Sequence, residues 1–200
     1  QEVLEPKTAQ ASNGAAPHRS TANQHLNAEQ GHWLLAKMGK KVLRPGGKEL
    51  TMLLMGKLAI SPTDELVEFA PGLGFTAGIA LQKNPKSYTG VELNEEAAGI
   101  LRKQIKGKGR EIVIGNACCC PLKNATADKV YGEAMLTMQA DHRKAEIIRE
   151  AHRILRPGGL LLCVEPNNLR NYVAFTSLTA VEPVETIVRR FEFWLRYQRG

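Results

Sequence analysis

Hydrophobic and polar positions along most of the chain follow the spacing of short strands connected by helices. Short apolar runs bounded by Gly, Pro or Asn predict strands, and apolar positions three or four residues apart predict amphipathic helices. The expected strands are 65–69, 87–93, 111–114, 129–132 and 160–165, and the expected helices are 76–82, 94–106 and 142–155. This alternation predicts an α/β fold: a doubly wound, mostly parallel, Rossmann-like sheet with helices on both faces and added N-terminal helices.

The two ends of the chain depart from this pattern. Residues 1–27 show no periodicity and are predicted to form a flexible N-terminal tail. Trp33 and Met38 lie on a helical stripe, and a second short helix is expected over 50–58, so 28–60 are predicted to form a helical cap before a domain over 61–200. Near the C-terminus, 172–180 fit a strand, whereas 187–197 fit either a helix or a strand.

Length and charge narrow the class of protein. The 200 residues suffice for one domain with a sizeable core. No apolar run approaches the roughly 18 residues of a membrane span, and 1–27 lack the apolar centre of a secretory signal, which predicts a cytoplasmic protein. The formal net charge is +7, but the basic residues are spread along the sequence and are rarely interleaved with aromatics. A solvated basic surface is therefore expected, and nucleic acid is not the expected partner.

The cysteines suggest neither a disulfide framework nor a metal site. Cys118, Cys119 and Cys120 are consecutive, and neighbouring cysteines cannot bridge without strain. With Cys163 as the fourth cysteine there is no C-x-x-C pair, so zinc is not expected. Reduced thiols packed as small apolar groups are the expected arrangement.

The most informative segment is the loop after the first expected strand, where Glu68 is followed by Ala70-Pro71-Gly72-Leu73-Gly74. A glycine loop between a strand and a helix lets the backbone approach a ligand closely, because Gly has no Cβ. Glu92 follows Gly72 by twenty residues and ends the next strand, where a carboxylate can accept hydrogen bonds from both hydroxyls of a ribose. The arrangement predicts a nucleoside cofactor; a tight turn beside a surface acid is the alternative.

Three later segments extend this pattern. Gly115-Asn116-Ala117 follows the third strand, Asp128 opens the fourth, and Arg156-Pro157-Gly158-Gly159 precedes the fifth. In this order they resemble the class I S-adenosylmethionine-dependent methyltransferases over about residues 66–165. The resemblance implies S-adenosylmethionine as the cofactor, held by Glu68, Ala70, Pro71, Gly72, Leu73, Gly74, Glu92, Leu93, Asn116, Ala117 and Glu133.

Each part of this set has an implied role. Glu68 and the glycine loop would hold the methionine portion, Glu92 the ribose, and Asn116 with Ala117 the adenine. Two departures from the family pattern stand out: Ala70 replaces the first glycine, and Asn116 replaces an acid, so its side-chain carbonyl accepts a hydrogen bond without bringing charge.

The catalytic residues are not assigned by the sequence, but two candidates stand out. Glu133 lies beyond the fourth strand and could contact the acceptor or the charged end of the cofactor, or simply favour a helix start. His142, next to Asp141, could act as a general base, or both residues could cap the following helix.

The resemblance implies in-line transfer of a methyl group to a small-molecule acceptor, and three alternatives stay open. A methyltransferase acting on RNA or DNA would suit the charge, but no N-P-P-Y-like element follows the fourth strand. An NAD-dependent oxidoreductase would suit 72–77, which fit G-x-G-x-x-A, but it leaves 115–117 unused. A non-catalytic binding module is suggested by the departures at Ala70 and Asn116.

Overall fold

The computed structural model describes residues 47–136, 138–164 and 183–189, all of which belong to one compact unit, Lys40–Gly200. A helical stretch at 184–189 follows the last strand. The elements before it, in chain order, are α2 (Gly47–Leu58), β1 (Glu65–Phe69), α3 (Phe75–Leu81), β2 (Ser87–Glu92), α4 (Glu95–Gln104), β3 (Arg110–Ile114), β4 (Ala127–Glu133), α5 (Asp141–Ile154) and β5 (Leu155–Val164).

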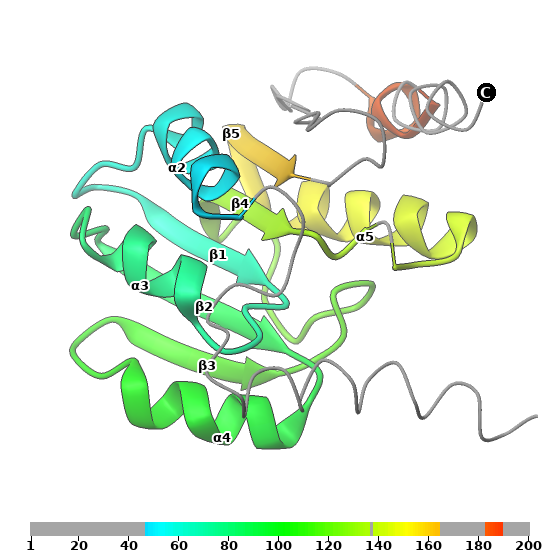
Figure 1. Ribbon diagram of the computed structural model, residues 1–200. Helices are drawn as coiled ribbons and strands as arrows, with labels where there is room; N and C mark the ends of the chain where they lie inside the picture. The colour runs from blue at the N-terminus through cyan, green and yellow to red at the C-terminus, as the bar shows by residue number, and fades with distance from the viewer. Residues whose placement is uncertain (1–46, 137, 165–182, 190–200) are drawn as a thin grey trace, which may run out of the picture. The chain divides into compact units, whose positions relative to one another are not determined.

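The strands form one five-stranded sheet in the order β3-β2-β1-β4-β5, with every neighbouring pair parallel (Figure 1). The chain moves outward from β1 to β3 and then crosses to the other side of β1 to form β4 and β5. The carboxyl ends of β1 and β4 therefore flank a topological switch point, the place where open α/β sheets bind ligands. The predicted doubly wound Rossmann-like fold is confirmed.

Alternate side chains of the strands point into two separate apolar cores. One core lies between the sheet and the three helices α2, α3 and α4, and the other lies between the sheet, α5 and residues 184–189. In β1, Leu66 belongs to the first core and Val67 to the second, which is the alternation expected of a strand buried on both faces. Helices thus pack against both faces of the sheet.

Local sequence signals explain where the helices begin. Asn94 caps α4, because its side-chain oxygen accepts a hydrogen bond from the Ala97 amide at 2.9 Å. Acidic residues follow in the first turn of α4 and basic residues occupy its last turn, as the helix dipole favours. The observed helix is therefore shorter than the one predicted over 94–106. It excludes Asn94, which is the cap, at its start, and Ile105 and Lys106 at its end.

The start predicted for the fifth strand is wrong. β5 begins at Leu155 and not at residue 160, since Ala127 pairs with Leu155 and Lys129 pairs with Leu160. The Arg-Pro-Gly-Gly segment is consequently an irregularity within β5, at which the register with β4 shifts. Gly158 in this segment has φ +82°, a conformation that glycine adopts readily.

Several predictions concern residues outside the described ranges. These are the tail over 1–27, the helix containing Trp33 and Met38, the strand over 172–180 and most of 187–197. Where 187–197 is described, at 187–189, it is helical. None of the helices within the described ranges is both long enough and apolar enough to cross a membrane.

Candidate functional site

The Glu92 carboxylate lies against the glycine loop at the carboxyl end of the sheet. Its Oε2 accepts a hydrogen bond from the Gly72 amide at 3.0 Å, and its Oε1 accepts one from the Asn94 amide at 2.9 Å. Glu92 is 7% exposed. Because each carboxylate oxygen has two acceptor positions, these two bonds leave capacity for further donors. The structure thus brings together the acid and the loop that the sequence singled out.

Three residues of the loop have the left-handed backbone conformation: Ala70 (φ +52°), Gly72 (φ +56°) and Gly74 (φ +80°). Ala70 therefore follows the path a glycine would favour, and its amide donates to the Val91 carbonyl at 2.9 Å. A Cβ built on Gly72 would meet nothing within 4 Å, so the space in front of this residue is open. A Cβ on Gly74 would lie only 2.8 Å from a methyl carbon of Leu101, which explains the glycine there.

Two exposed apolar side chains lie beside this loop. Leu93 directly follows Glu92 and is 65% exposed, and Ile114, which is paired with Glu92 in the sheet register, is 42% exposed. Apolar groups next to a carboxylate suit a flat, apolar base joined to a sugar. The contact of Leu93 with the cofactor stays a prediction, and Ile114 was not among the residues predicted from the sequence.

Asn116 closes a tight turn after β3. Its Oδ1 accepts from the Cys118 amide at 3.0 Å, and its backbone carbonyl accepts from the Cys119 amide, also at 3.0 Å. This is the local hydrogen bonding of an Asx turn. The neighbouring Ala117 packs against the core that contains α5. Contacts of Asn116 and Ala117 with adenine stay predictions.

Glu68 is buried beneath the loop and holds two tyrosines. Its Oε2 accepts from the hydroxyls of Tyr88 at 2.6 Å and Tyr131 at 2.7 Å, and Glu68 is 2% exposed. Burial, reinforced by the nearby carboxylate, raises the pKa of both phenols well above their usual range, so they remain donors. Glu68 therefore joins β1, β2 and β4. Its contact with the methionine portion stays a prediction, and the tyrosines were not foreseen.

Glu133 connects two helices to the carboxyl end of β4. Its Oε1 accepts from the Thr51 hydroxyl of α2 at 2.8 Å, and its Oε2 accepts from the Thr76 hydroxyl of α3 at 2.8 Å. Thr51 is fully buried and belongs to a helix far away in the sequence. Glu133 thus fixes α2 and the start of α3 at the edge where the glycine loop emerges. Its predicted contact with the cofactor or acceptor is not tested by these bonds.

Asp141 and His142 are exposed in the first turn of α5. The N-cap of this helix is Ala140, and no side chain caps it; Asp141 instead accepts from the Lys144 ammonium at 3.1 Å. Neither residue therefore occupies the N-cap position, and the helix dipole favours the acidic Asp141 in the first turn. His142 follows the segment that leaves the carboxyl end of β4, and its role as a base stays a prediction.

All four cysteines are free thiols. Cys118 is half-buried, Cys119 is exposed, and Cys120 and Cys163 are buried. Burial raises the pKa of Cys120 to about 11. Within the described ranges, no group of His, Cys, Asp and Glu side chains is arranged to hold a metal ion.

A groove of about 360 Å³ lies away from these residues, on the sheet face beneath the loop that connects β3 to β4. Neither Glu92, Gly72 nor Glu133 lines it. The groove is therefore separate from the polar contacts of Glu92 and Glu133 at the carboxyl edge. The groove is lined by Glu65, Leu66, Val67, Ser87, Thr89, Glu111, Val113, Pro121, Leu122, Lys123 and Thr126.

Comparison with known proteins agrees with this geometry. Residues 67–163 match the sequence model of a family described as a methyltransferase domain. An uncharacterized protein of Haemophilus influenzae is 38% identical over 139 residues, which are 67% of this chain and 55% of that protein. A protein of Synechocystis, named as an uncharacterized methyltransferase, is 26% identical over 148 residues, or 73% of this chain and 68% of that protein.

A solved structure also resembles this chain in its fold. A Bacillus halodurans protein provisionally assigned as a methyltransferase superposes with a TM-score of 0.53 at 25% identity, covering 58% of this chain and 51% of that protein. The chain thus spans about half the length of the Haemophilus and Bacillus proteins, at 55% and 51%.

Proposed function

Because residues 67–163 form a class I S-adenosylmethionine-dependent methyltransferase domain, we propose that the protein binds S-adenosylmethionine at the carboxyl edge of its sheet and transfers the methyl group to a small molecule. The observation that carries the proposal is the contact between the buried Glu92 carboxylate and the Gly72 amide.

The residues at this edge have the chemistry that an adenosine group needs. Glu92 has free acceptor capacity for the two ribose hydroxyls, and the open space in front of Gly72 admits a ligand against the backbone. Leu93, which follows β2, and Ile114, which ends the neighbouring β3, offer exposed apolar surface for the base. An adenosine cofactor therefore fits the donors, the acceptors and the apolar surface present.

S-adenosylmethionine, when bound, supplies a methyl group on a positively charged sulfur. The protein then has mainly to align the two reactants. Holding them in line with water excluded can lower the activation barrier by up to about 7–11 kcal/mol. Glu133 supports this task because its bonds to Thr51 and Thr76 hold α2 and α3 at the mouth of the site. We propose Glu133 as a positioning group and His142 as a candidate base on the same edge.

The charge of the carboxyl edge favours a small acceptor over a nucleic acid. A phosphate backbone would be repelled by the carboxylates that gather there, while a small neutral or cationic molecule would not. The sequence also has no N-P-P-Y-like element after β4 and no Pro-Cys pair, the two motifs expected of nucleic-acid methyltransferases. The carboxylates concerned are Glu92, Glu95, Glu96, Glu133 and Asp141.

The proposal is tested by following a labelled methyl group. The full chain is incubated with S-adenosylmethionine labelled in its methyl group and with separate pools of small metabolites, nucleic acid and protein. We expect label in a small product with the wild-type chain, loss of that product with Glu92→Ala, and little change with the exposed neighbour Glu96→Ala. Label in nucleic acid or protein instead, or full transfer by Glu92→Ala, would contradict the proposal.

A further inference from the structure

Lysines far apart in the sequence gather at the amino edge of the sheet, opposite the proposed cofactor site. In a parallel sheet every connection returns to the amino end of the next strand. Lys83 and Lys86 precede β2, Lys106 and Lys108 precede β3, and Lys123 precedes β4. All five are exposed. The basic residues, which are spread along the sequence, thus include a group that the fold brings to one edge of the sheet.

Backbone and side-chain contacts place the first two of these connections side by side. The Tyr88 amide donates to the Gly109 carbonyl at 2.8 Å, and the Arg110 guanidinium donates to the Pro85 carbonyl at 3.0 Å. A Cβ on Gly109 would lie 3.0 Å from the carbonyl oxygen of Lys86. Lys86 and Lys108 thus belong to touching turns.

The third connection faces these turns across the groove described above. Lys123 and Thr126 line this groove from the loop that leads into β4, while Ser87 and Glu111 line it from β2 and β3. The Thr126 hydroxyl donates to the Lys123 carbonyl at 3.0 Å, which fixes the loop. The result is a concave surface lined by the Lys123 ammonium, by hydroxyl groups and by the carboxylates of Glu65 and Glu111, with the other lysines on the adjoining turns.

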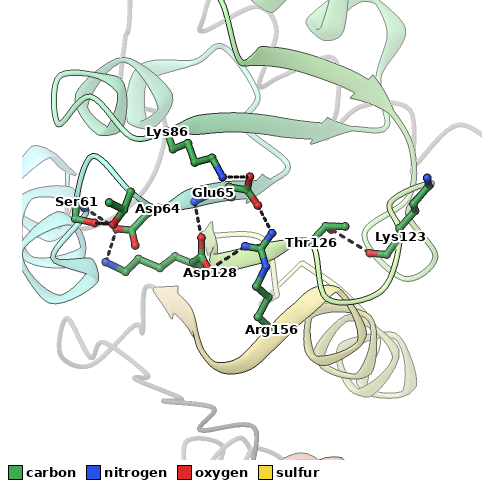
Figure 2. Close-up of polar contacts among 10 residues, drawn as sticks. Ser61, Asp64, Glu65, Lys86, Lys123, Thr126, Asp128 and Arg156 are labelled. Atoms are coloured by element: carbon green, nitrogen blue, oxygen red, sulfur yellow. Dashed lines mark hydrogen bonds and ion pairs between the residues drawn. The ribbon is translucent and has the colours of Figure 1, made fainter.

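Most carboxylates near this surface are already paired with cations. Figure 2 shows Glu65 between Lys86 and Arg156, and Asp128 bonded to Arg156 on its other side. The Lys123 ammonium lies apart from these ion pairs (Figure 2). Glu111 is an exposed carboxylate that opposes the positive field. In the part of the chain that the structure describes, Lys83, Lys106, Lys108 and Lys123 form no ion pair.

We propose that this amino edge docks the phosphate backbone of a double-stranded nucleic acid. Lysines act as flexible point charges for phosphates, and the hydroxyl of Ser87 can add a hydrogen bond. Contacts of this kind bind without reading sequence, and they depend strongly on salt. The surface is thus an anchoring site, separate from the acceptor site at the opposite edge.

Two observations favour a duplex over other polyanions. Single strands are held by exposed aromatic side chains on which bases stack, and no Phe, Tyr or Trp side chain in the described ranges is exposed. Anionic membranes are held by charge together with inserted apolar groups. The exposed large apolar residues of the described ranges, Met52, Leu53, Leu93, Ile114 and Met138, all lie outside the three lysine-bearing connections.

The test compares two charge-reversal variants in full-length chains. Lys106→Glu with Lys108→Glu changes the proposed surface, and Lys48→Glu with Arg189→Glu makes the same change in net charge at exposed positions elsewhere. Binding of a fluorescent DNA duplex of about 20 base pairs is measured by anisotropy over a range of salt concentrations. Circular dichroism checks that both variants are folded. This test does not depend on methyl transfer, so its outcome is independent of the proposed function.

We expect the wild-type chain to bind the duplex with an affinity that falls linearly with salt on logarithmic axes. The surface variant should bind at least about ten-fold more weakly with a salt slope reduced by roughly two, while the control stays within about threefold. Glu111→Gln should strengthen binding. Equal losses in both variants, no binding at low salt, or binding to anionic vesicles in preference to the duplex would overturn the proposal.

Discussion

The Glu92 side chain and the Gly72 backbone amide, twenty residues apart in the sequence, meet through a hydrogen bond of 3.0 Å. The bond joins the carboxyl end of β2 to the loop that follows β1, and these two strands are neighbours in the sheet. A carboxylate so held cannot swing away from the loop, because the Asn94 amide fixes its other oxygen. The relative position of the two groups that would hold a nucleoside is therefore set by the fold before any ligand binds.

Replacing Ala70 by glycine should stabilise the protein. Ala70 has φ +52°, which costs an L-residue roughly 1–2 kcal/mol, and glycine removes most of this strain. Part of the gain is offset by the greater freedom of glycine in the unfolded chain, so we expect about 0.5–1 kcal/mol in urea unfolding. Ala77→Gly, in the interior of α3, is the contrasting variant and should destabilise. A destabilised Ala70→Gly protein would mean that strain at this residue is not relieved.

Removing either tyrosine hydroxyl beneath the loop should destabilise the fold. Tyr88→Phe and Tyr131→Phe each remove one hydrogen bond to the buried Glu68 carboxylate, and bonds to charged groups contribute about 1.5–3 kcal/mol. The double variant should lose a different amount from the sum, because both hydroxyls bind the same oxygen. Chemical unfolding of the four proteins measures this coupling. Strict additivity would show that the two bonds act independently.

Acid should weaken the protein partly through Asp64. Burial opposes ionisation of this carboxyl, but hydrogen bonds from Lys129 and Ser61 outweigh burial and lower its pKa. A pKa lowered by folding contributes stability above the pKa of the unfolded chain, and the contribution disappears as the pH falls through the folded value. Asp64→Asn should therefore flatten the loss of stability below about pH 4, the range in which an unperturbed Asp titrates. Exposed Glu96→Gln is the control, and an equal flattening by both would contradict this assignment.

The consecutive cysteines should react with thiol reagents in a fixed order. Cys119 is exposed and should react first. Cys118 is half-buried, and burial raises the pKa of its thiol despite the nearby Arg143, so it should be slower. Cys120 is buried with a pKa of about 11 and should react last. Mass spectrometry after brief alkylation gives the order, and fast labelling of Cys120 would show that the turn opens.

The fold was predictable because its signals are local. Apolar runs marked the strands, and the glycine loop marked a boundary between elements, whereas Asn94 was placed inside the helix that it caps. The start of β5 was missed because it depends on pairing between Ala127 and Leu155, a contact over 28 residues that no local pattern encodes. Pro157 and Gly158 look like a turn in sequence, and only the sheet register shows that the strand continues through them.

The candidate site was predicted in part. The glycine loop and Glu92 stood out because a close backbone approach and a strand-end acid have few other uses together. The partners of Glu68 and Glu133 were not foreseen, since Tyr131 and Thr51 look like ordinary core residues in the sequence. The lysines of the amino edge appeared dispersed for the same reason: their connections meet only when the sheet forms.

The most direct test of the account is the affinity of the full chain for S-adenosylmethionine, S-adenosylhomocysteine and NAD, measured by calorimetry with wild type, Glu92→Ala and Glu96→Ala. We predict binding of the first two ligands and not of NAD. Glu92→Ala should weaken that binding by at least about ten-fold, because bonds of ribose hydroxyls to a carboxylate are lost. Glu96→Ala should bind normally. Binding of NAD alone, or unchanged affinity in Glu92→Ala, would contradict the account.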